Sequence, residues 1–109
     1  MAKTITIEDD GKKYTLEFTR KSIEAMERQD FVISDAASKP MSTLPALFAG
    51  AFLAHHKFVK RDVIDAIFKK LPDKEKLFEK LAEMYTEPLE ALMEDPEESE
   101  GNVTWGTSW

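Results

Sequence analysis

The chain has 109 residues, a length at which a protein forms one hydrophobic core, so we expect a single domain. It contains no Cys and only two His, which are adjacent, so disulfides, thiolate nucleophiles and three-His metal sites are excluded within one chain. With 42% apolar and 33% charged residues, the composition is typical of a soluble intracellular protein, and we expect no enzymatic activity.

The formal net charge of −6 is unevenly distributed. Residues 1–86 contain all 15 Lys and Arg and 14 of the 21 acidic residues, whereas residues 87–109 contain the remaining acids and no base. A near-neutral body lacks the excess positive charge that sequence-independent binding to nucleic acid requires, so we expect no nucleic-acid partner. The acidic stretch is typical of a solvated tail, or alternatively of a segment that docks onto a basic partner.

No segment of the sequence predicts a membrane or secretory location. The most apolar stretch, residues 41–53, is shorter than the ~20 residues that a helix needs to span a bilayer. The first residues lack the apolar core of a signal peptide. We therefore expect no membrane partner and a cytoplasmic location.

The first predicted element is a β-hairpin. Apolar and polar residues alternate over residues 4–8 and 13–18, on either side of the turn sequence Asp-Asp-Gly-Lys at residues 9–12. An Asp-Gly pair flanked by such alternation is a strong short-range signal for a hairpin. One face of the hairpin is apolar, and a lone two-stranded hairpin is marginal in water, so helices or another sheet must cover that face.

A short amphipathic helix is predicted at residues 20–29, where Ile23 and Met26 share one face and Thr19 is placed as the N-cap. The helical period is lost over residues 30–40, which predicts a connector. Within it, the apolar run at residues 31–33 is a candidate for a short extra strand.

The second helix is predicted to start near Ser42 or Thr43, with Pro45 tolerated in its first turn. Large apolar residues follow one side of this helix at helical spacing, and small residues line the other side. A helix that is apolar on nearly every side is buried on several of them. It is therefore either the central helix of a helical core, or a helix that meets another subunit or lines a groove for a partner helix.

Two further amphipathic helices are predicted, one at residues 61–71 and one that begins at Lys74 with Asp73 as its N-cap. Pro88 is expected to kink or split the last helix, because it lacks a backbone donor and clashes one turn back. The expected architecture is α+β: an N-terminal β-hairpin and about four helices form one domain at residues 1–95. A flexible acidic tail that ends in Trp follows at residues 96–109.

The sequence predicts no catalytic, cofactor-binding or metal-binding residue. His55 and His56 are neighbours on a helix and point about 100° apart, so they do not chelate one ion and are expected to be structural or solvent-facing. No serine lies in a nucleophile-elbow motif, and no glycine-rich phosphate loop is present in the sequence.

Residues with a role in partner binding are predicted in two places. Gly50, inside the second helix, costs about 1 kcal/mol relative to Ala, which favours a close approach by another helix or backbone. Trp105 and Trp109 lie beyond the last helix, and Trp is enriched in binding hot spots, so this segment either folds back onto the body or docks into a neighbouring subunit. The candidate partner-binding residues are Leu47, Phe48, Gly50, Ala51, Phe52, Trp105 and Trp109.

The order of elements and a set of packing positions resemble a known family. The hairpin leads into Phe-Thr-Arg-Lys-x-Ile-x-x-Met-Glu-Arg at residues 18–28, followed by Lys39-Pro40 and by Leu-x-x-Gly-Ala-Phe-Leu-x-x-His at residues 47–56. An acidic tail with Trp closes the chain. This pattern resembles the small tail assembly chaperones of long-tailed phages and prophages of Gram-positive bacteria, which are encoded just before the tape-measure protein. The resemblance covers residues 5–95 and is clearest over residues 14–58.

The resemblance implies a small, self-associating, non-enzymatic protein that works in the host bacterial cytoplasm. Such proteins coat the tape-measure protein, keep it soluble and give way to tail-tube subunits, and many also exist in a longer, frameshifted form. The alternative is a structural phage protein, such as a head–tail connector or tail-completion protein, that stays in the virion. An acidic DNA-mimic inhibitor is less favoured, because the negative charge lies in the tail rather than on the folded surface.

Overall fold

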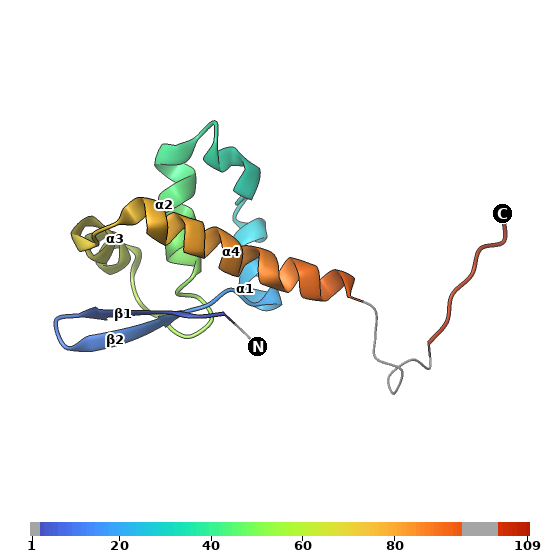
Figure 1. The fold of residues 1–109 in the computed structure, drawn as a ribbon, viewed down its shortest axis with the longest axis horizontal. Helices are drawn as coiled ribbons and strands as arrows, with labels where there is room; N and C mark the ends of the chain where they lie inside the picture. The colour runs from blue at the N-terminus through green and yellow to red at the C-terminus, as the bar shows by residue number, and fades with distance from the viewer. Residues whose placement is uncertain (1–2, 95–102) are drawn as a thin grey trace.

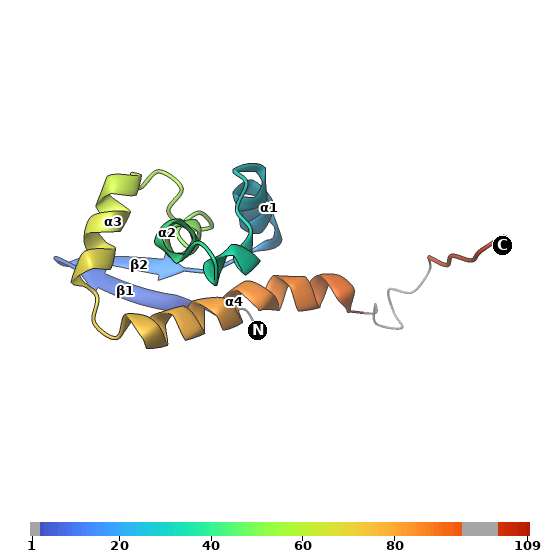
Figure 2. The ribbon, with the colours of Figure 1, turned by 90° about the horizontal axis from the view of Figure 1, so that it is seen from above.

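A computed structural model describes residues 3–94 and 103–109 and has the α+β architecture that the sequence predicts. Its elements are β1 (Ile5–Asp9), β2 (Lys12–Leu16), α1 (Arg20–Arg28), the short 3₁₀ helix η1 (Ile33–Ala36), α2 (Pro40–Gly50), α3 (Arg61–Lys70) and α4 (Lys74–Met93). The four α-helices lie on one side of the hairpin (Figure 1). Seen from above, α4 runs alongside the hairpin and its last turns extend beyond the rest of the body (Figure 2).

The hairpin is confirmed, with β1 and β2 antiparallel in a register that pairs Ile5 with Leu16 and Ile7 with Tyr14. Asp10 and Gly11 form the turn, with φ angles of 51° and 79°. A two-residue type I′ turn needs positive φ at both central positions, which Asp-Gly adopts more readily than other pairs. A hydrogen bond from Lys70 Nζ to Asp9 Oδ1 (2.7 Å) ties α3 to the end of β1 and raises the pKa of Lys70.

The predicted N-cap of α1 is also confirmed. Ser22 donates its backbone N–H to Thr19 Oγ1 (3.1 Å), and Thr19 donates its own N–H to Ser22 Oγ (2.9 Å). This reciprocal capping box satisfies two backbone donors at the start of the helix. The apolar face of α1 places Ile23 and Met26 in the core, as the spacing predicts.

The connector between α1 and α2 differs from the prediction. The apolar run at residues 31–33 does not form a strand: the backbone turns at Asp30 (φ 65°) and then forms η1. The outer edge of β2 is contacted instead by the segment that follows α2. Thr15 of β2 donates its N–H to His56 Nε2 (2.9 Å), and Glu17, just beyond β2, donates its N–H to the Ala51 carbonyl (3.0 Å).

α2 begins at Pro40, earlier than predicted, with Pro40 in the first turn where its missing N–H costs nothing. Pro45 consequently lies inside the helix rather than in its first turn. The helix ends at Gly50, and the chain continues through turns to His55. One side of this helix has the central position that the sequence predicts, because Leu47 and Phe48 are buried in the core of the same chain.

Two details predicted for α4 are wrong, the side-chain cap at Asp73 and a split at Pro88, whereas a kink at Pro88 stays a prediction. Asp73 does not cap the helix with its side chain, because its backbone is left-handed (φ 50°) and an N-cap residue needs an extended conformation. Pro88 does not split α4, which is continuous from Lys74 to Met93. The turns before Pro88 are anchored by the buried side chains of Leu81, Met84 and Tyr85, which hold the helix together despite the lost hydrogen bond.

Aromatic side chains join the elements in the core. Phe48 and Phe52 are fully buried with ring centroids 5.3 Å apart, and Phe68 of α3 lies 5.2 Å from Phe48. At the other end of the core, Tyr85 of α4 meets the Phe18 ring edge-on at 5.2 Å. Burial, with a smaller contribution from the nearby Glu27 carboxylate, raises the pKa of Tyr85.

Most of the predicted junction between domain and tail, residues 95–102, lies outside the described residues. The described part of the tail, residues 103–109, has no helix or strand and is exposed throughout. Among residues 3–94 and 103–109, no helix is both long and apolar enough to cross a bilayer.

Candidate functional site

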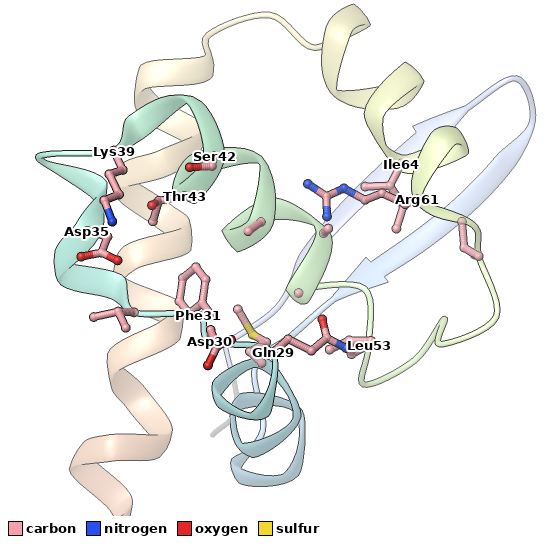
Figure 3. A pocket seen from close by; sticks show the side chains of 16 residues that line it. Gln29, Asp30, Phe31, Asp35, Lys39, Ser42, Thr43, Leu53, Arg61 and Ile64 are labelled. Carbon is pink, nitrogen blue, oxygen red and sulfur yellow. The ribbon is translucent and has the colours of Figure 1, made fainter.

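A groove lies beside α2, and we call it the α2 groove. Its volume is about 440 Å³, and it is lined by the end of α1, the connector with η1, one side of α2, the loop after α2 and the start of α3 (Figure 3). The apolar part of its lining includes Met26, Phe31, Ala46, Ala49, Leu53 and Ile64. A hollow of this size with an apolar lining is suited to binding side chains of a partner.

The groove exists because one side of α2 carries small residues. Ala46, Ala49 and Gly50 share a helix face at i, i+3 and i+4 spacing, and all three line the hollow. Larger side chains, such as Phe31, Leu53 and Ile64, line the hollow around this face without filling the space beside it. The stripe of small residues was visible in the sequence, whereas the contributions of Phe31, η1 and α3 were not, because they come from distant segments.

Charged residues of both signs surround the apolar lining. Lys39 and Asp35 stand on the η1 side, and Arg61 stands on the α3 side (Figure 3). Arg61 Nε also donates to Asp65 Oδ1 (3.1 Å). A groove with an apolar floor and a polar rim has the layout of a protein-binding site.

The groove contains only one of the α2-region residues predicted to contact a partner. Leu47, Phe48, Ala51 and Phe52 are at most 2% exposed, so they belong to the core of their own chain and offer no surface to a partner. This corrects their assignment as contact residues; the apolar pattern that singled them out is the pattern of a core helix. Gly50 does lie on the groove wall.

Gly50 is a point of close approach, but a side chain rather than a helix backbone approaches it. A Cβ atom added at Gly50 would overlap Sδ and Cε of Met26 from α1. The absence of a side chain at position 50 therefore makes room for Met26, which links α1 to α2 beneath the groove.

Trp105 and Trp109 are 88% and 100% exposed in the structure. In this conformation they are not folded back onto the body, so the first of the two interpretations of this segment is not what the structure describes. Val103 is also exposed. Three large apolar side chains thus lie on one short segment without cover from their own chain.

A second, smaller hollow of about 180 Å³ lies between α1 and the last turns of α4. Ile23, Leu89 and Leu92 contribute its apolar lining, and Arg20 and Glu24 its polar rim. Leu92 and Met93, at the end of α4, are more than half exposed.

The two histidines have structural partners. His56 accepts the Thr15 N–H through Nε2, which places the proton of the neutral ring on Nδ1, and its ring meets that of Tyr14 edge-on at 5.2 Å. His55 Nε2 lies 2.7 Å from Glu17 Oε1 at the surface. No group of three or more His, Asp or Glu in the part of the chain that the structure describes is arranged to hold a metal ion.

These environments predict losses of stability of different size when the two adjacent histidines are replaced. His56→Ala leaves the Thr15 N–H without its acceptor and removes ring contacts, so we expect it to lower the free energy of unfolding by about 1–3 kcal/mol. His55→Ala breaks only an exposed pair and is expected to cost about 0–1 kcal/mol. Urea unfolding of both variants measures the difference. Equal losses would show that the hydrogen bond from the Thr15 N–H to His56 does not stabilise the edge of β2.

The family model described as "Domain of unknown function (DUF5055)" matches residues 1–109, so the chain belongs to the DUF5055 family. Searches of curated proteins and of solved structures gave no match to the chain.

Proposed function

We propose that this member of the DUF5055 family is a phage tail assembly chaperone that holds the tape-measure protein in soluble form until tail-tube subunits replace it. The observation that carries the proposal is the α2 groove, with its apolar lining and charged rim. The resemblance over residues 5–95 supplies the identity of the client. The chaperone would act in the host bacterial cytoplasm, by contacts between proteins and without catalysis.

The client's chemistry fits the groove. A tape-measure protein is a long helical chain with apolar stripes, which aggregate unless they are covered. Grooves recognise amphipathic helices by taking apolar side chains spaced at i, i+3, i+4 and i+7. The small residues Ala46, Ala49 and Gly50 leave room for such side chains beside α2.

The rim supports the same interpretation. Asp30 and Asp35 contribute negative charge to the groove lining, and Lys39 and Arg61 contribute positive charge. Charges on a rim contribute more to orientation and specificity than to affinity. A helix with charges of both signs flanking its apolar stripe would therefore lie in a preferred direction.

The test is to produce the tape-measure protein that the resemblance predicts to be encoded next to this chain, alone and together with the chain. We expect a several-fold larger soluble fraction of tape-measure protein with the native chain. Ala46→Arg places a long cation in the groove and should abolish most of this gain, whereas Ala82→Arg, on the exposed side of α4, should retain it. An equal gain from both variants would show that the α2 groove is not the client site.

Mass spectrometry of purified virions separates the chaperone from the alternative, a connector or tail-completion protein. A chaperone is expected to be absent from finished particles or present only in traces. Stoichiometric amounts of the chain in the particle would overturn the proposal in favour of a structural role.

A further inference from the structure

We propose that the α2 groove also binds residues 103–109 of a second copy of the chain, which we call the Trp segment. Each copy carries one groove and one Trp segment, so copies would associate head to tail. The inference concerns the chain alone and stands apart from tape-measure binding.

The Trp segment has the form of a ligand. In an extended chain, side chains at alternate positions point to the same side, so Val103, Trp105 and Trp109 share one face. These three side chains are each at least 88% exposed. Trp supplies a large apolar area with few rotatable bonds, which is why it dominates binding hot spots.

The groove matches this ligand in shape and polarity. Its volume of about 440 Å³ falls in the range of about 300–1,000 Å³ that is typical of pockets for small organic groups. Ala46 and Ala49 leave the hollow open, and Phe31, Leu53 and Ile64 provide apolar walls against which an indole ring would lie. Polar groups at Thr43 and Gln29 are available to the indole N–H.

Charge favours the same pairing. The sequence from residue 94 to residue 100, directly before the Trp segment, contains five acidic residues and no base. The loop that borders the groove, residues 51–60, contains Lys57 and Lys60 and no acid, and its residue Val59 lines the groove. On the rest of the lining, Lys39 and Arg61 balance the charges of Asp30 and Asp35. An incoming Trp segment would therefore bring its acidic stretch toward a basic loop, with an attraction that salt weakens.

In the structure the Trp segment does not occupy the groove of its own chain, because Trp105 and Trp109 are exposed. The last turns of α4 extend past the body, and residues 103–109 lie apart from the helices in both views (Figures 1 and 2). Because the groove and the segment are different surfaces, the contact is heterologous and can propagate into an open chain of copies.

Trp105 and Trp109 are the only tryptophans in the chain, so intrinsic tryptophan fluorescence reports on this segment alone. We expect the emission of the full chain to shift to shorter wavelength as its concentration rises from nanomolar to high micromolar. Larger species should appear in sedimentation over the same range. In Ala46→Arg the transition should need at least about tenfold more protein, the size of effect expected when a hot-spot contact is lost. Ala82→Arg should behave as the native chain.

Mixing two variants identifies the partner. Ala46→Arg keeps its tryptophans but has a blocked groove, and Trp105→Ser/Trp109→Ser keeps the groove but gives no tryptophan signal. Adding the second variant to the first should restore the shift to shorter wavelength, because the segment of one copy enters the groove of the other. Ser42→Arg, at an exposed lining position, serves as a second blocked variant if Ala46→Arg unfolds at a lower temperature than the native chain.

A shift that does not depend on concentration, or that mixing fails to restore, would show that the segment binds its own chain or another surface, and would overturn the proposal. Emission of exposed tryptophan at every concentration would also overturn it. None of these measurements contains tape-measure protein, so their failure leaves the proposed function to its own test.

Discussion

Phe48→Ala is expected to lower the free energy of unfolding by about 3–5 kcal/mol, the usual cost of removing a buried Phe side chain. Phe48 has no exposed surface, and its ring contacts those of Phe52 and Phe68 at centroid distances of 5.3 and 5.2 Å. The substitution leaves a cavity between α2 and α3, in the packed core of the chain. A loss of this size is a large part of the 5–15 kcal/mol by which domains are stable.

Phe58 provides a matched control. It is the same residue type in the loop after α2, but it is 87% exposed, so Phe58→Ala should change the stability by less than about 0.5 kcal/mol. Urea or thermal unfolding of the two variants makes the comparison. If Phe48→Ala unfolded like the native chain, Phe48 would be free to act as a contact residue and its assignment to the core would be wrong.

Gly50→Leu is expected to cost about 1–3 kcal/mol through overpacking. The new side chain would occupy the space that holds the thioether of Met26 and would force Met26 toward the α2 groove. Gly50→Ala should cost less, because the end of a Met side chain is flexible and can move away from a single methyl group.

A double-mutant cycle tests the cause. In a Met26→Ala background the obstacle is gone, so Gly50→Leu should cost clearly less there than in the native chain. Gly106→Leu is the control substitution, because nothing lies within 4 Å of a Cβ added at that position. The free energy of unfolding of this variant should equal that of the native chain. Additive losses from Met26→Ala and Gly50→Leu would show that the two residues do not compete for the same space.

The proposed function and the head-to-tail association share one surface. The tape-measure helix and the Trp segment would both occupy the α2 groove, so the client would displace one copy from the next. Self-association would then protect the apolar lining of the groove while no client is present.

Elements that depend on short-range chemistry were predictable from the sequence. The Asp-Gly turn with alternation on both sides specified the hairpin, and Thr19 followed by an amphipathic period specified α1 and its start. The apolar character of α2 on nearly every side correctly indicated that its large residues Leu47 and Phe48 are buried. The third helix, at residues 61–70, followed from its single apolar stripe.

Only the tertiary structure decided where these elements leave a site. The run at residues 31–33 has strand-forming residues, but the structure places Phe31 and Val32 in the groove wall and begins η1 at Ile33. The side of α2 available to a partner is the one with small residues, because the large residues are used by the core of the same chain. Local sequence determines which faces are apolar, whereas the arrangement of segments distant in sequence determines which of those faces stays uncovered.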